Sequence, residues 1–346
     1  MSSRNSKGGT IVPRRVAALS PFALLLSVFA GCASQQHMSV RVMAPAVVDL
    51  GGYSLVALDR LEGDGSSEVT AELADALRAA RNPLTSRAEF EVLDRRDLDR
   101  MLDDVRRQRG NDVGGQQLEM LERWKKAEVM IRGQIATHGV ESTVTAQDWV
   151  DPKTGAAHRT FTRAARACVD VTLEIVTGAG EHVVDRQTFN GAAGTQTRSV
   201  DCQPAQIDAT PLLADARAQV LRQFMDRVLP HEETVGVVLQ TDGDLPELQA
   251  GNGFARTGDW PEAERSYRAA GDHASGDLAE VRWKAQHNLG VALTFQGRYD
   301  DARTALREAY AMGQDEGSLQ MLQLSSRRQE DAQRLRQQDR AATPNR

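Results

Sequence analysis

A dense run of charged side chains is the first place to look for chemistry in this sequence. Five carboxylates occur in one short segment: Asp94, Asp97, Asp99, Asp103 and Asp104. Paired carboxylates are typical of general acid–base sites. Three arginines are interleaved with them, namely Arg95, Arg96 and Arg100. Because alternating opposite charges are typical of a solvated, ion-paired helix face, we predict such a face here and no acid–base pair.

The sequence patterns that usually mark an active site are missing from this chain. It contains no His-Glu-x-x-His, no Gly-x-Ser-x-Gly, no Walker-type glycine loop and no Gly-x-Gly-x-x-Gly after a predicted strand. Its seven histidines are scattered without the spacing of metal ligands. We therefore expect a protein that is not an enzyme and that needs neither a metal nor a dissociable cofactor.

Cys32 is the strongest chemical signal in the chain. It follows a basic segment and an interrupted apolar run, Val16 to Ala30, which is shorter than the about 20 apolar residues of a membrane-spanning helix. Such a sequence is typical of a secretory signal. The residues Phe29-Ala30-Gly31-Cys32 resemble the bacterial lipobox, usually Leu-Ala-Gly-Cys, with Phe29 in place of the leucine. The resemblance implies that residues 1–31 are removed and that Cys32 becomes an acylated N-terminus.

A lipid on Cys32 would anchor the whole chain. Two or more acyl chains such as palmitate make a stable membrane anchor. Ala33 and Ser34 follow the cysteine, and the lack of an aspartate there favours, by the family's sorting pattern, the periplasmic face of the outer membrane. The alternative is an ordinary secreted protein in which Cys32 is incidental.

The remaining cysteines, Cys168 and Cys202, are a disulfide candidate. An exported protein lies in an oxidising compartment, where two leftover cysteines often pair. The alternatives are two buried thiols or a reactive pair, although a redox role would favour the absent Cys-x-x-Cys spacing.

The charge of the chain excludes one class of partner. The formal net charge is −6, and removing the basic signal makes the remainder more acidic still. An acidic protein lacks the basic surface with which proteins bind nucleic acids, so we expect no nucleic-acid partner.

The middle of the chain alternates between strand and helix patterns. We predict the order strand, helix, strand, helix, helix, strand, strand, strand, helix, in segments near 53–58, 66–80, 90–92, 94–105, 116–127, 127–140, 166–176, 183–189 and 212–229. Residues 32–50 are expected to be a tether and 145–160 a loop. This order predicts an α/β sandwich, an α+β fold with a mixed sheet, over residues 51–235.

This α/β segment resembles a known periplasmic domain. The stretches "VVDLGGYSLVALDRLEG", "FEVLDRRDLDRMLDD", "AEVMIRGQIA" and "VDVTLEIVTGAGEHV" are similar, in this order, to curli-secretion lipoproteins (CsgG-like) and to lipoprotein activators of penicillin-binding proteins (LpoB-like). The resemblance implies a Cys-anchored lipoprotein. Curli channels insert extra membrane hairpins, but residues 141–165 lack the alternation that such strands need. We therefore expect a loop there, and keep a CsgG-like curli or secretion channel component as the alternative function.

The C-terminal third contains two similar segments. Gly258, Trp260 and Ala263 recur as Gly297, Tyr299 and Ala302 at a shift of 39 residues. The pattern resembles tetratricopeptide (TPR) repeats, which implies an all-α helical-repeat domain over residues 245–313. Residues 314–346 are expected to supply a capping helix and a disordered tail. The alternative is an unrelated pair of helical hairpins.

Repeat hairpins stack into a concave surface that commonly receives a peptide. We expect its partner-binding residues on the first helix of each repeat: Asn252, Arg256, Arg282, Gln286 and Asn288. The alternative is that the repeats pack against the α/β domain or mediate self-association. The sequence thus predicts a lipid-anchored interaction module for an envelope or secreted protein, acting in cell-envelope assembly, export or peptidoglycan-synthase regulation. Homo-oligomerisation is left open.

Overall fold

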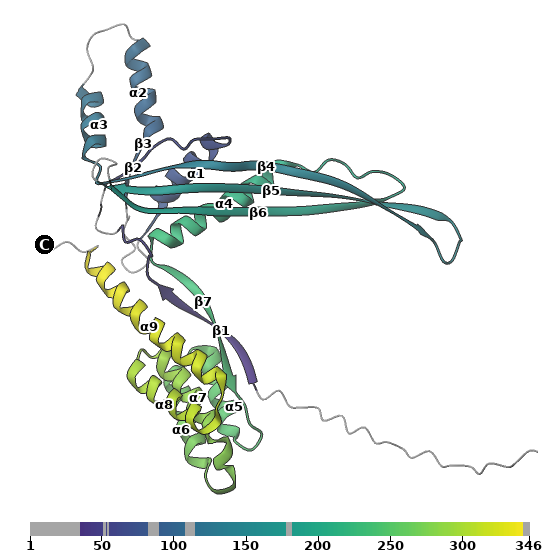
Figure 1. Ribbon diagram of the computed structural model, residues 1–346, viewed down its shortest axis with the longest axis vertical. Helices are drawn as coiled ribbons and strands as arrows, with labels where there is room; N and C mark the ends of the chain where they lie inside the picture. The colour runs from purple at the N-terminus through teal and green to yellow at the C-terminus, as the bar shows by residue number, and fades with distance from the viewer. Residues whose placement is uncertain are drawn as a thin grey trace, which may run out of the picture.

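The computed structural model describes residues 35–50, 53, 55–81, 90–107, 115–177 and 182–341. Figure 1 shows an α/β body at one end, a helical region at the other end and a two-stranded ribbon between them. The fold class is therefore mixed α/β with a mixed sheet, followed by a C-terminal helical region, as the sequence predicts. Cys32 and the preceding residues lie outside the described residues.

The α/β body contains a five-stranded mixed sheet. Its strands, in spatial order, are β3 (Glu91–Asp94), β2 (Leu55–Leu58), β4 (Val129–Val150), β5 (Ala157–Thr177) and β6 (His182–Val200). Strand β2 runs parallel to both β3 and β4, whereas β4, β5 and β6 form an antiparallel meander. The strands and helices predicted from the sequence occur in the predicted order.

Two helices, α1 (Ser66–Ala79) and α4 (Ala209–Val228), cover one face of this sheet. Alternate residues of β5 point towards them and are almost fully buried, namely Val169, Val171, Leu173 and Ile175. The helices contribute Leu73, Leu77 and Phe224 to the same core. A pleated strand with one buried face produces this alternation, so the core is built from the period-2 pattern of the sequence.

A helical hairpin projects from the far edge of the sheet, as Figure 1 shows at the top of the view. It consists of α2 (Arg95–Arg107) and α3 (Gly115–Lys126). Asp94, at the end of β3, accepts a hydrogen bond from the main-chain N–H of Arg96 and so caps the start of α2.

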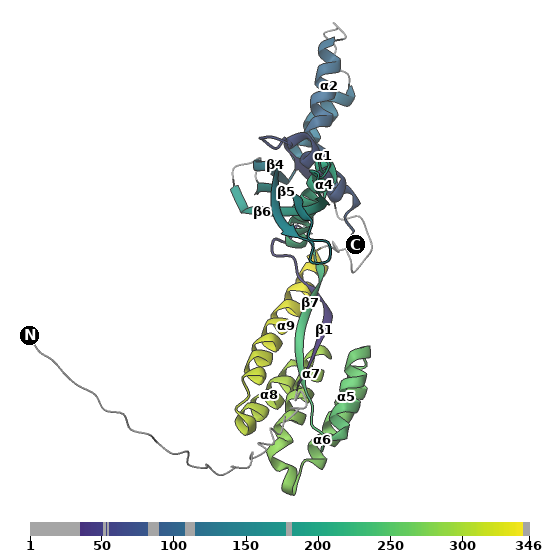
Figure 2. The same cartoon turned by 90° about the vertical axis from the view of Figure 1, so that its right-hand side faces the viewer.

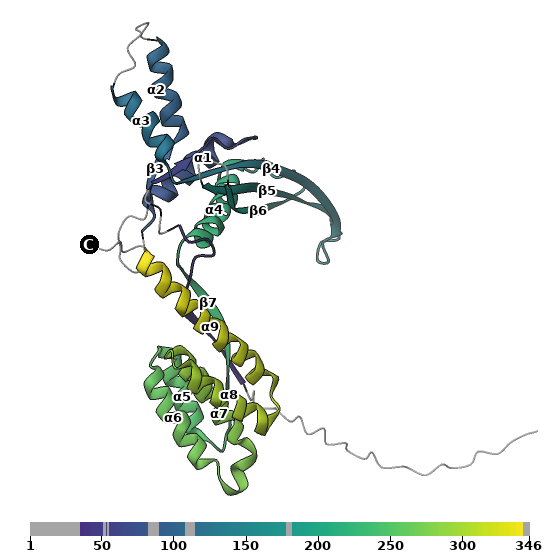
Figure 3. The ribbon, with the colours of Figure 1, turned by 60° about the vertical axis from the view of Figure 1, so that its left-hand side comes forward.

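The prediction of a loop near residues 145–160 is wrong. Strands β4 and β5 pair without interruption from Thr137–Asp170 out to Val150–Ala157, so only a short turn joins them. Together with β6 they form a long curved arm that extends beyond the helices (Figures 1 and 3). Cross-strand pairs stabilise it in place of a hydrophobic core: Asp148 bonds to Arg159, and Trp149 stacks on His158 at 4.9 Å between ring centroids.

The prediction of a tether at residues 32–50 is also wrong for the residues of this segment that the structure describes. Residues Gln35–Ala44 form strand β1, which pairs antiparallel with β7 (His231–Gln240), from Gln35 opposite Gln240 to Ala44 opposite His231. One face of this ribbon is apolar, and Val237 and Leu239 lie in the core of the helical region. The ribbon therefore belongs to the folded protein and connects its two ends.

The helical region begins with two consecutive antiparallel helix pairs. They are α5 (Pro246–Thr257) with α6 (Trp260–His273), and α7 (Arg282–Phe295) with α8 (Tyr299–Gly313), separated by the short 3₁₀ helix η1 (Gly276–Val281). Gly258 and Gly297 make the turns within each pair with φ values of 81° and 75°, a conformation that favours glycine. Gly251 contacts Tyr267 closely, as Gly290 contacts Leu306, so these glycines are equivalent at the 39-residue shift.

A long last helix, α9 (Glu316–Ala341), runs from the helical region back to the base of the α/β body (Figure 3). Gln338 both accepts from the N–H of Ala46 and donates to its carbonyl, at 3.1 and 3.0 Å. The guanidinium of Arg328 bonds to the carbonyl of Met43 and to the Glu233 carboxylate. Among the described residues, no helix combines the length and apolarity needed to cross a membrane.

Candidate protein-binding site

The buried seam between β7 and the helical pairs contains several specific polar contacts from side chains to main-chain atoms. At its centre, Asn288 Oδ1 accepts a hydrogen bond from the N–H of Gln240 at 2.7 Å, and Asn288 Nδ2 donates to the carbonyl of Gln240 at 2.9 Å. Asn252 Nδ2 donates to the same carbonyl at 3.2 Å. We call Asn252 and Asn288 the asparagine clamp. A side-chain amide that binds both main-chain groups of one residue replaces a neighbouring strand.

The clamp is itself held by buried hydrogen bonds. Tyr267 donates its hydroxyl to Asn252 Oδ1 at 2.9 Å, and Asn288 Nδ2 lies 3.1 Å from the same oxygen. Burial raises the pKa of Tyr267 well above its ordinary value, so this hydroxyl stays protonated and remains a donor. Both asparagines have no exposed surface. Their amide orientations are therefore fixed by partners on three different elements.

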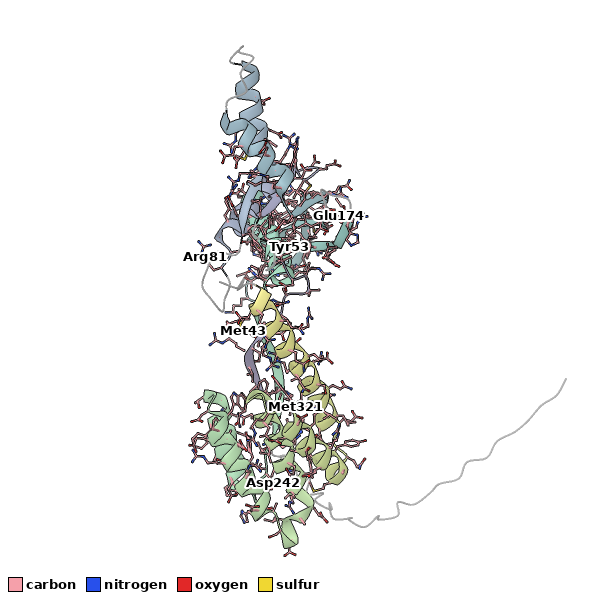
Figure 4. All side chains as sticks on the ribbon, turned by 90° about the vertical axis from the view of Figure 1, so that its left-hand side faces the viewer. Met43, Tyr53, Arg81, Glu174, Asp242 and Met321 are labelled. Carbon is pink, nitrogen blue, oxygen red and sulfur yellow. The ribbon has the colours of Figure 1, made fainter. Side chains whose placement is uncertain are left out.

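Two further side chains of α7 hold the end of β7. His287 Nε2 lies 2.9 Å from the carbonyl of Val238, and Lys284 Nζ lies 2.7 Å from the carboxylate of Asp242. Burial alone would raise the pKa of Asp242, but the hydrogen bond from Lys284 brings its pKa below the ordinary value. Figure 4 labels Asp242 close to the helical pairs, below the ribbon. The extended chain is thus fixed over its last residues by α5 and α7.

This seam corrects the predicted partner site. Asn252 and Asn288 do hold an extended chain, but that chain is β7 of the same molecule, so neither side chain is exposed. Arg256 and Arg282 are exposed, and Gln286 is half-buried, away from the clamp. The physical reason is that the apolar face of β7 packs into the hydrophobic core of the helical pairs.

Sequence reasoning missed Gln240, His287, Lys284 and Tyr267. A signal for β7 was nevertheless present, because Val235, Val237 and Leu239 alternate with other residues directly before the helical pairs. The one-turn spacing of Lys284, His287 and Asn288 was a second signal, since it places all three on one face of a helix.

His287 sits in a relay of polar groups. Its Nε2 faces a carbonyl and must donate, while Nδ1 faces Ser318 Oγ at 2.9 Å; Ser318 Oγ is also 3.0 Å from the Asp315 carboxylate. Burial lowers the pKa of His287, although Val238 and Asp315 oppose that effect. The neutral ring is therefore the favoured state near neutral pH, while the Ser318 hydroxyl donates to the Asp315 carboxylate.

Acidification is expected to destabilise this seam. Because the pKa of His287 is lower in the folded chain, the unfolded chain binds more protons below the ordinary histidine pKa of about 6.5, and stability falls as pH falls. Each unit of pKa difference amounts to about 1.4 kcal/mol. This loss of stability is measured by urea unfolding of the wild type and of His287→Gln at pH values of about 8 and 5.5. A variant that loses as much stability on acidification as the wild type would contradict this role.

The predicted disulfide between Cys168 and Cys202 is wrong in this structure, where both are free thiols. Cys168 lies opposite Ala192 in the middle of the arm, whereas Cys202 follows the end of β6, where Val200 lies opposite Thr160. The eight residues between Thr160 and Cys168 span about 26 Å of strand. A disulfide needs Cα atoms within about 7 Å, so this register forbids the pair.

The charged segment of α2 behaves as predicted. Asp94 is almost fully buried and forms ion pairs with Arg96 and Arg78, and Arg95 pairs with Asp99 one turn along the helix. Burial alone would raise the pKa of Asp94, but Arg96 lowers it below its ordinary value. Three of the five carboxylates, Asp94, Asp97 and Asp99, thus form ion pairs with arginines. Within the described ranges, no cluster of three His, Cys, Asp or Glu side chains could hold a metal ion.

Comparisons with known proteins give only distant likenesses. No family model matches the chain, and no curated protein matches it. Two PelC dodecamer structures from Paraburkholderia phytofirmans are similar at 11% and 12% identity, covering 55% and 57% of this chain and 97% and 100% of theirs, with TM-scores of 0.27 and 0.24. A hypothetical protein from Chlamydia trachomatis, CT253, is 9% identical over 40% of this chain and 72% of its own, with a TM-score of 0.19. These TM-scores are too low to carry an argument about what this chain does.

Proposed function

We propose that this chain is a non-enzymatic lipoprotein scaffold of the cell envelope. In this proposal Cys32 anchors it to the periplasmic face of the outer membrane, and a CsgG-like α/β domain and a TPR-like domain are presented to protein partners. Its role would lie in envelope assembly, export or the regulation of peptidoglycan synthases. The proposal needs no cofactor besides the covalent lipid.

One observation carries the scaffold role, namely the double connection between the α/β body and the helical region. The ribbon provides the first connection, since the asparagine clamp fixes its lower end. Helix α9 provides the second, since Gln338 and Arg334 bind the main chain of Ala46 beside the α/β body. Two separate connections hold both parts at a fixed spacing, which is what a protein that positions partners requires.

The geometry of the helical pairs supports the TPR assignment. Ala263 and Ala302 are fully buried at equivalent places in α6 and α8, where a small side chain allows two helices to approach closely. The glycine turns, the buried alanines and the packing of Gly251 and Gly290 all recur at the same shift. These features support two repeats, with α9 as the capping helix.

The anchor is tested by the Cys32→Ala variant. Metabolic labelling with a clickable fatty acid is expected to mark the wild type and leave the variant unlabelled, and the variant is expected to leave the membrane fraction. Cys202→Ala serves as the matched control, because Cys202 is an exposed thiol that the proposal does not use. Equal labelling of wild type and Cys32→Ala would exclude the anchor.

The long arm favours a second candidate, a secretion channel component. Strands β4, β5 and β6 have the length that such a role needs, and they occupy the segment that was expected to be a loop. Against it, the outer part of the arm carries charged side chains, among them Glu141, Asp148, Arg159 and Arg198. Conductance across planar bilayers containing the purified lipoprotein separates the two candidates, since a scaffold gives no ion current.

A further inference from the structure

Strand β7 has an outer edge that is only partly used. In an antiparallel pair, successive residues direct their main-chain N–H and C=O groups to opposite edges. The groups of Gln240 and Val238 point away from β1, because Asn288 and His287 bind them. Thr234 and Gly236 share their parity, so their main-chain groups point to the same outer edge. Among the residues that the structure describes, no side chain or loop is seen to bind them.

A groove of about 460 Å³ lies between this open edge and helix α9. Its β7 wall runs over residues 234–238, and its α9 wall includes Met321, Leu324 and Arg327. Figure 2 shows α9 running alongside β7, with β1 on the other side of the strand. Figure 4 labels Met321 at this level of the molecule.

We propose that this β7–α9 groove binds an extended segment of a partner protein as a third strand of the ribbon. The main-chain groups of Thr234 and Gly236 would pair with the incoming segment, as occurs when peptides add to open sheet edges. At Gln240 the same edge already binds the side-chain amides of the asparagine clamp. The added strand would bind the next part of this edge.

The walls of the groove define the side chains of this segment. Met321 and Leu324 give the α9 wall an apolar part, with Met321 almost fully buried and Leu324 partly buried. Side chains of a strand alternate between two faces, so the segment needs apolar residues at alternate positions. Gly236 leaves room above the edge, since a Cβ built there meets no atom within 4 Å.

The charge of the groove adds one further requirement. Arg327 is exposed, and the residues that line the groove include no carboxylate. An acidic residue in the segment, near Arg327, complements this charge. The expected occupant is therefore an extended segment with alternating apolar residues and an adjacent carboxylate.

This inference rests on the proposed scaffold function and names the chemistry of its partner. It is tested separately, because binding is measured with purified protein in solution. A failed anchor at Cys32 would leave the groove intact, and an empty groove would leave the anchor intact.

The probe is a fluorescein-labelled seven-residue peptide that alternates valine with threonine and ends in glutamate. We expect a saturable rise in fluorescence anisotropy with the full-length protein. Two matched peptides carry N-methyl groups, one on every valine and the other on every threonine. Only one set of N–H groups can face β7, so one methylated peptide should lose at least about tenfold in affinity, roughly 1.4 kcal/mol, and the other should bind normally.

Substitutions in the protein complete the test. Gly236→Pro removes one N–H from the open edge, where proline is tolerated because that group is not part of the β1–β7 ladder. It should weaken binding about tenfold, while Gly236→Ala should bind like the wild type and thermal melts should confirm that both fold. Arg327→Glu should lower the affinity for the peptide ending in glutamate and raise the affinity for a peptide ending in lysine.

Three results would overturn the proposal. They are no binding of the unmethylated probe at millimolar protein, equal binding of all three peptides, and unchanged affinity in a folded Gly236→Pro variant. A shift of Gly236→Pro from dimer to monomer in native mass spectrometry would identify a second copy as the occupant and exclude the partner segment.

Discussion

Replacing Asn288 with alanine is expected to destabilise the protein by about 2–4 kcal/mol. The change removes both hydrogen bonds that Asn288 makes to Gln240 and leaves the buried N–H of Gln240 without its partner. It also removes a contact to Asn252, although Tyr267 still donates to that side chain. A buried donor without an acceptor carries the full desolvation cost, which exceeds the net value of the lost hydrogen bond.

Urea unfolding followed by circular dichroism measures this loss, with Gln286→Ala as the matched control. Gln286 lies on the same helix, α7, but outside the clamp, so its substitution should change stability by less than about 0.5 kcal/mol. Limited proteolysis should also cut Asn288→Ala faster near residues 241–245, where the chain leaves β7. Equal stability of the two variants would show that the clamp does not hold the ribbon.

Replacing Gly191 with alanine is expected to cost about 3 kcal/mol or more, or to prevent folding. A Cβ at this position would lie 1.9 Å from the carbonyl oxygen of Ala216 and 2.8 Å from its carbonyl carbon. Both are main-chain atoms of α4, so no side-chain rotation relieves the clash. The helix would have to move away from β6, breaking the bonds of Gln219 to both main-chain groups of Ala192.

Gly139→Ala is the matched control for this variant. Gly139 also lies in the arm, opposite Cys168, and a Cβ there meets nothing within 4 Å. Its free energy of unfolding should stay within about 0.5 kcal/mol of the wild type. If Gly191→Ala melts at the temperature of Gly139→Ala, then α4 does not pack on β6 as closely as described.

The sequence was informative where a buried face imposes a local period. Val69, Leu73 and Leu77 recur every four residues, and all three are buried in α1 against the sheet. Val169, Val171 and Leu173 alternate and form the buried face of β5. These patterns exist because one side of each element excludes water, and they predicted the order of elements in the α/β body.

The outer half of the arm has no such pattern. Strand β4 is exposed on both faces there, so nothing forces apolar and polar residues to alternate between Glu141 and Val150. Main-chain hydrogen bonds and pairs such as Asp148 with Arg159 hold it together, and neither leaves a period in the sequence. The pairing of β1 with β7 was not predicted for another reason. Strands β1 and β7 each alternate, but about 190 residues separate them, and local patterns do not show which strand pairs with which.

The candidate site was predicted in part. The sequence pointed to Asn252 and Asn288 as side chains that bind an extended chain, and they do so. It could not show that the extended chain is the protein's own strand, because that depends on where Pro246 and the start of α5 place residues 231–240 in space. A concave apolar surface beside a strand of the same chain is filled first by that strand, at a far higher effective concentration than any partner.

The direction of β1 has a mechanical consequence. Gln35 lies at the end of the ribbon beside the helical pairs, and Ala44 lies at the end beside the α/β body, about 30 Å of strand away. A pulling force between the N-terminal end of β1 and the α/β body therefore runs along β1 itself. The helical pairs lie outside this load path. The force reaches them through the β1–β7 pairing, through the bonds of the asparagine clamp and His287 to β7, and through α9.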